Sequence, residues 1–84
     1  MFQYDFSFDK LTAAQYGRGV LDSMYLPVRL LRAPQAAAKR GCAYVLRVAG
    51  RDGARAAELL RQNGAGYSAS FRILPDGTAE EAGL

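Results

Sequence analysis

The chain has 84 residues, half of them apolar and 23% charged, which predicts one small soluble domain without room for a second. No apolar run reaches the ~20 residues that span a bilayer, and a start without a basic, cleavable leader together with a single cysteine predicts a cytoplasmic protein with no disulfide and no membrane contact. Residues 1–75 hold all 11 basic residues but only five of the eight acidic ones, and the resulting net charge of +6 suits either an anionic partner or an ordinary solvated surface.

Residues 2–8 alternate aromatic and polar side chains, which is typical of a strand with one buried face. A helix is expected next, with Asp9 or Thr12 as its N-cap. Its apolar stripe, at spacings of three and four, consists of Ala13, Gly17, Val20, Leu21 and Met24. Pro27 separates this helix from the next element.

Residues 28–31 are expected to form a second, short strand that ends near Pro34. The Ala-rich residues 35–41 favour a helical turn, with Gly41 as a left-handed terminator. The nearly unbroken apolar run of residues 43–48 predicts a central strand.

The second half of the chain contains one more helix and one more strand. Asp52 is a plausible N-cap for a helix that continues to Asn63. Residues 67–73 return to strict alternation and predict a fourth strand. Pro75 then begins a turn, and residues 76–84 are expected to be a polar C-terminal tail.

The order strand, helix, strand, strand, helix, strand within residues 1–75 predicts a single ferredoxin-like α+β domain, with a four-stranded antiparallel sheet and two helices on one face. Strand parity assigns to the helix side Phe6, Phe8, Tyr44, Leu46, Phe71 and Ile73. It assigns to the open face Gln3, Asp5, Ser7, Arg29, Val45, Arg47, Ser70 and Arg72.

The residues that could carry chemistry reduce to Cys42. The chain has no His, its acids show no paired spacing, and no phosphate-binding glycine motif occurs, so we expect no enzyme, no metal site and no cofactor. Cys42 follows a basic loop, and the topology predicts that it lies near the start of the first helix; both features favour the thiolate. The residues expected around it are Thr12, Pro34, Lys39, Arg40 and Gly41. A small, buried apolar side chain is the alternative interpretation of Cys42.

Two segments carry a family resemblance: Val28-Arg29-Leu30-Leu31-Arg32-Ala33-Pro34, and Gly41-Cys42-Ala43-Tyr44-Val45-Leu46-Arg47. With the helix and strand patterns of residues 4–74, they resemble the Se/S carrier protein-like family of small bacterial proteins. The resemblance implies that Cys42 holds sulfur or selenium as a persulfide-type adduct, and that donor and acceptor proteins are its partners. Pro34 takes the place of the family's proline, whereas Ala43 stands where glycine is usual.

Two other functions are compatible with the same pattern. Residues 40–45, Arg-Gly-Cys-Ala-Tyr-Val, also resemble the third-strand signature of RNA-recognition motifs. Cys42 and Arg47 stand where that family needs aromatic residues, so we expect no nucleic-acid partner. The third possibility is a regulatory or oligomerising domain without chemistry, for example a homodimer formed through the open sheet face.

Overall fold

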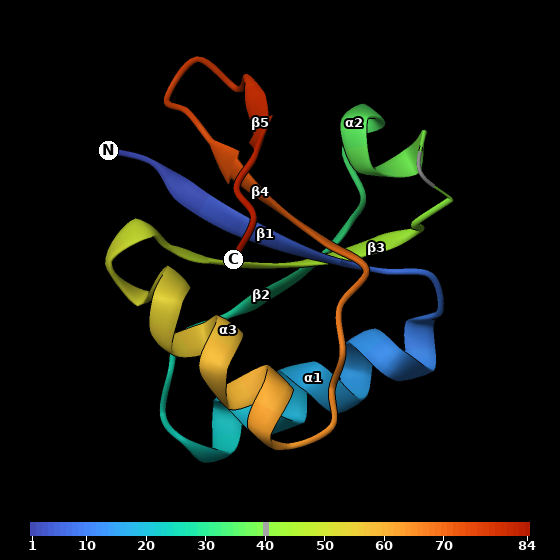
Figure 1. The fold of residues 1–84 in the computed structure, drawn as a ribbon, viewed down its shortest axis with the longest axis vertical. Coiled ribbons are helices and arrows are strands. Elements are labelled where there is room, and N and C mark those ends of the chain that lie inside the picture. Colours follow the sequence, from blue (N-terminus) through green and yellow to red (C-terminus); the bar gives the residue numbers. More distant parts are fainter. Residues whose placement is uncertain (40) are drawn as a thin grey trace.

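An antiparallel sheet, to which the described residues contribute five strands, forms the centre of the protein. A computed structural model describes residues 1–39 and 41–84 of the chain. Its strands are β1 (Gln3–Phe8), β2 (Arg29–Arg32), β3 (Tyr44–Ala49), β4 (Ala69–Ile73) and β5 (Ala79–Glu81). They lie in the order β2-β3-β1-β4-β5, and every neighbouring pair is antiparallel (Figure 1). The α+β class is therefore confirmed, with five strands in place of the four predicted.

The two longer helices cover one face of this sheet. They are α1 (Leu11–Ser23) and α3 (Gly53–Gln62), whereas the four-residue α2 (Gln35–Ala38) lies on the other side (Figure 1). A short 3-10 turn, η1 (Gly50–Asp52), leads into α3. Within the described part of the chain, no helix combines the length and apolar character that a membrane span needs.

The start of α1 differs from the prediction. Lys10 is its N-cap residue, with an extended backbone and no side-chain capping bond. Thr12 therefore lies inside the first turn, exposed, and the prediction that it or Asp9 caps the helix is wrong. The N-terminus of α1 begins without the side-chain capping that usually marks such a boundary.

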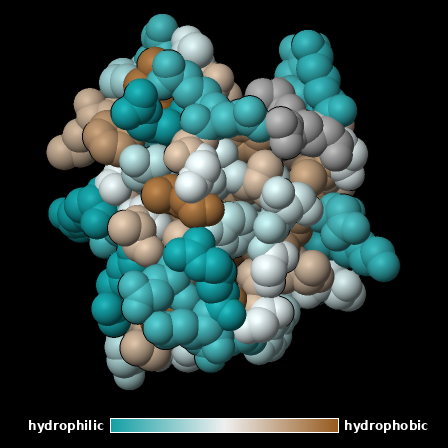
Figure 2. Space-filling model, viewed as in Figure 1, coloured by the Kyte–Doolittle hydropathy of each residue, from teal (hydrophilic) through white to brown (hydrophobic). Residues whose placement is uncertain are grey.

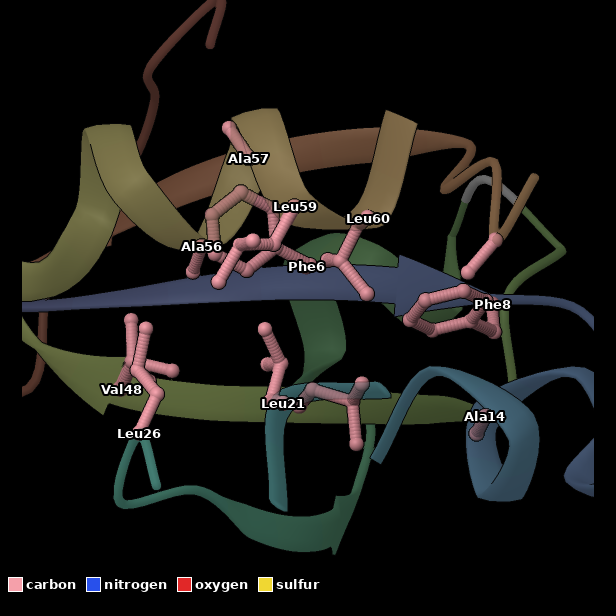
Figure 3. Packing of buried hydrophobic residues seen from close by; sticks show 12 residues of the cluster. Phe6, Phe8, Ala14, Leu21, Leu26, Val48, Ala56, Ala57, Leu59 and Leu60 are labelled. Carbon is pink, nitrogen blue, oxygen red and sulfur yellow. The ribbon is translucent and has the colours of Figure 1, made fainter. Parts of the chain in front are cut away.

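The main core lies between the sheet and the two longer helices (Figure 3). Its largest fully buried side chains are Phe6, Phe8, Leu21, Leu46 and Leu60. The parity prediction for β1 and β3 is thus confirmed for these strand residues.

The side chains of β4 face opposite to the prediction. Phe71 pairs with Asp5, and Ser70 pairs with Phe6, so Phe71 and Ile73 point away from the helices. Residues on both sides of β4 are buried. Ser70 is buried on the helix side, where its Oγ accepts a 2.8 Å hydrogen bond from Leu84 N–H. The buried members of a second, smaller cluster on the open face are Cys42, Val45, Phe71 and Ile73.

Part of the expected polar tail belongs to the sheet. Residues 79–81 form β5, and Arg72 holds Glu80 through a 2.8 Å ion pair. The intervening turn is closed at Asp76, whose Oδ1 accepts a 2.9 Å hydrogen bond from Thr78 N–H; this bond lowers the pKa of Asp76. The end of the chain is anchored as well, because Tyr67 Oη donates a 2.6 Å hydrogen bond to the Leu84 carbonyl.

Candidate functional site

Cys42 lies two residues before β3 and is only 4% exposed. The backbone is where the topology predicts, because the next residue, Ala43, donates a 3.1 Å hydrogen bond to the carbonyl of Phe8 at the end of β1. The thiol, however, packs with Val45 and Phe71 in the second cluster, on the face of the sheet opposite α1. Its packing is that of a small buried apolar side chain.

The residues predicted around Cys42 are scattered. Lys39 and Gly41 are exposed, Pro34 is half-buried, and Thr12 is on α1, on the other side of the sheet. Arg40 lies outside the described residues. Gly41 adopts the predicted left-handed conformation, with φ of 83°. Within residues 1–39 and 41–84, no hydrogen bond or ion pair joins the Cys42 thiol to any of these predicted neighbours.

The open face carries a buried ion pair that no sequence spacing indicated. The Asp5 side chain is 0% exposed and accepts hydrogen bonds of 2.7 and 2.9 Å from Nε and Nη2 of Arg47. The hydrogen bond to Asp5 raises the pKa of Arg47. The two residues are 42 positions apart in sequence, and the β1–β3 register alone brings them together. The Asp5 carboxylate and the Arg47 guanidinium therefore compensate each other's charge.

The other ligands considered from the sequence find no site in the described residues. Among these residues, no group of three or more His, Cys, Asp and Glu could hold a metal ion. Phe6 and Phe8 of β1 point into the main core, so β1 presents Gln3, Asp5 and Ser7 to the open face. Base stacking in an RNA-recognition motif needs aromatic residues there.

The turn between α1 and β2 contains a strained, fully exposed aromatic residue. Tyr25 is 94% exposed and has φ of 58°, in the left-handed region. The helix ends there in a Schellman motif, in which Leu26 N–H donates to the Leu21 carbonyl and Tyr25 N–H to the Asp22 carbonyl, both at 3.0 Å. Glycine usually occupies this left-handed position. Met24, the residue before Tyr25, was expected in the buried stripe of α1 but is 45% exposed.

This turn continues directly into a strand at the edge of the sheet. Among the described strands, β2 pairs with β3 alone. Arg29 and Arg32 at its two ends are exposed, and Leu30 and Leu31 between them are half-buried. We call residues 24–32 the β2 surface. The sequence did not indicate the β2 surface. Met24 follows Leu21 at helical spacing, and this spacing predicts that Met24 belongs to the buried apolar stripe of α1.

Figure 2 shows polar and apolar side chains interspersed on the side of the molecule seen in Figure 1. No broad apolar area marks a binding site on that side, and the apolar members of the second cluster are already buried within the monomer. Comparison of the chain with protein-family models, with curated protein sequences and with solved structures finds no match. The resemblance to the Se/S carrier protein-like family thus stays a prediction.

Proposed function

We propose that the chain is a non-catalytic interaction module of ferredoxin-like architecture, which binds a partner protein through the β2 surface. The strand order β2-β3-β1-β4, with α1 and α3 on one face, supports the ferredoxin-like assignment. In this assignment β5 is an addition at the edge of the sheet beside β4. A cytoplasmic location belongs to the proposal, because a lone free thiol suits a reducing compartment.

The observation that carries the proposal is the conformation of Tyr25. A left-handed backbone costs an L-residue about 1–2 kcal/mol relative to glycine, which is a sizeable part of the ~5–15 kcal/mol that stabilises a small domain. At 94% exposure, the tyrosine ring gains little packing within the monomer to offset this cost. Strained positions of this kind concentrate at functional sites, and exposed tyrosines are frequent anchors of protein interfaces.

A peptide-display selection tests this proposal and requires no known partner. A random peptide library is selected on the immobilised chain and counter-selected on the Tyr25→Gly variant. We expect peptides that bind the original chain and lose binding to the variant. Leu11→Gln is the matched control, because Leu11 is 40% exposed and lies at the opposite end of α1. Recovery of no Tyr25-dependent peptide would contradict the proposal.

Sulfur or selenium transport by Cys42 is the second candidate function. It is favoured by the surroundings of Gly41, the residue before the thiol: Gly41 is exposed, and a Cβ placed on it would meet no atom within 4 Å. Donor and acceptor proteins could approach from this exposed side. Because Cys42 is only 4% exposed, the second candidate needs a local opening around the thiol.

The reactivity of Cys42 distinguishes the two functions. Under the interaction-module proposal, iodoacetamide alkylates Cys42 at least ~10-fold more slowly in the folded chain than in denaturant, because a buried thiol reacts only after local opening. Incubation with a cysteine desulfurase then leaves no persulfide on Cys42 by mass spectrometry. A folded-state rate equal to that in denaturant, together with a trapped persulfide, would instead establish the carrier function.

A further inference from the structure

We infer that the free edge of β2 binds an extended acidic segment of another protein, which adds to the sheet as a further strand beside β2. This inference rests on the proposed function and specifies the chemistry of the partner. The segment carries two acidic residues three positions apart, with two apolar residues between them. Each feature follows from the residues of β2.

The first step is the edge itself. β2 pairs with β3 on one side, and no other described strand pairs with it. In an antiparallel strand that is paired on one side, part of the backbone N–H and C=O groups point away from the partner strand. An exposed edge of this kind accepts an incoming strand through main-chain hydrogen bonds.

The second step is the charge of this edge. Within the described chain, Arg29 and Arg32 have no acidic partner; the guanidinium of Arg32 instead lies 6.0 Å from the ring centroid of Tyr44. The cross-strand neighbour of Arg29 is another cation, Arg47, whose charge is already neutralised by Asp5. Two uncompensated positive charges therefore flank the edge and favour acidic side chains on the incoming strand.

The third step is the spacing. Arg29 points to the open face, as does its partner Arg47, and Arg32 points to the helix face. Residues three positions apart on a strand point to opposite faces, so an incoming strand needs acidic residues three apart to meet both arginines. The half-buried Leu30 and Leu31 lie between them. The two middle residues of the partner segment are therefore apolar, one on each face.

A second copy of the chain fits this edge poorly. Antiparallel pairing of two β2 strands would place arginines of one copy beside arginines of the other, which is unfavourable. The acidic edge strand β5 has its two glutamates adjacent rather than three apart, and Glu80 is held by Arg72. The charge pattern thus favours a different, acidic chain.

The test is a fluorescence-anisotropy titration of the full chain with a labelled peptide of the pattern acid, apolar, apolar, acid in an extended context. We expect binding that weakens as salt is added. The double variant Arg29→Glu, Arg32→Glu should lose at least ~10-fold in affinity and bind the peptide whose acids are replaced by lysine. Arg51→Glu, Arg55→Glu is the matched control, since both arginines are exposed and belong to η1 and α3 rather than to β2; it should change affinity by less than ~3-fold.

The outcomes separate this inference from the proposed function. If display selection yields Tyr25-dependent peptides that bind the Arg29→Glu, Arg32→Glu variant unchanged, the interaction module stands and the acidic-strand inference is overturned. Equal losses in both double variants would also overturn it, because they would indicate attraction by net charge alone. Self-association that disappears in the Arg29→Glu, Arg32→Glu variant would identify β5 of a second copy as the occupant and equally refute the inference. Selection of no peptide would refute the proposed function itself.

Discussion

At the scale of single residues, the two candidate functional residues differ in exposure: Tyr25 is exposed and Cys42 is buried. Tyr25 projects from the molecule in a backbone conformation that suits glycine, whereas Cys42 is held among apolar side chains. A residue that destabilises the fold and contacts little of it is better explained by a partner than by packing. The thiol, in contrast, contributes to a small core in the same way as its neighbour Val45.

The strain at Tyr25 can be measured directly. Replacement by glycine should raise the free energy of unfolding by about 1 kcal/mol, because glycine adopts φ of 58° without steric cost. A gain of this size raises the melting temperature of a domain this small by ~4–8 °C. Tyr25→Ala is the control, since alanine keeps the strain and should give no gain. An unchanged or lower melting temperature for Tyr25→Gly would show that the tyrosine is not strained.

The sequence singled out Cys42 as the residue that could carry chemistry but could not determine its exposure. Parity rules apply inside a strand, and β3 begins two residues later, at Tyr44. Cys42 therefore packs on the face opposite to the one that the alternation of β3 predicts. The exposure of Tyr25 was equally hidden, because the position where α1 ends depends on the Schellman hydrogen bonds rather than on apolar spacing.

At the scale of elements, glycines show where helices and sheet approach most closely. Gly17 faces the sheet, and a Cβ there would lie 3.0–3.2 Å from side-chain atoms of Leu46, Leu60 and Phe8. Gly53, the first residue of α3, packs against the ring of Tyr4, and a Cβ there would overlap that ring. Gly19, also in α1, faces open space. Of these three glycines, Gly17 and Gly53 are therefore required by packing, whereas Gly19 is not.

Alanine substitutions should separate these cases. Gly19→Ala should stabilise the chain by about 0.5–1 kcal/mol, since alanine favours the helix and meets no neighbour. Gly53→Ala should destabilise it by about 1–3 kcal/mol, because the Tyr4 ring has to move. Urea unfolding of the two variants beside the original chain measures both changes. Loss of stability in Gly19→Ala, or none in Gly53→Ala, would contradict the packing of the helices described above.

The faces of the strands were predictable only where one face is clearly polar. In β1, aromatic residues alternate with polar ones, and the aromatic side is the core side as expected. In β4, Ser70 and Phe71 are both buried, on opposite faces, because the sheet carries a second apolar cluster. Alternation alone therefore identifies a strand but not the direction in which its apolar side points.

At the scale of the whole molecule, the order of helices and strands up to Ile73 was readable from periodicity, capping glycines and turns. The fifth strand could not be predicted, because it has only three residues, two of them acidic. Its position depends on the ion pair of Glu80 with Arg72. The β2 edge could not be read either, since the position of a strand within a sheet is a property of the assembled fold. The proposed interaction site thus emerged only from the structure.

The most direct test of the interaction module is an NMR titration of the ¹⁵N-labelled chain with a peptide obtained by display selection. We expect the largest amide shift changes to fall within residues 24–32, and Tyr25→Gly to remove them. Changes centred instead on Cys42 and its neighbours Val45 and Phe71 would contradict the interaction module and return the function to the cysteine.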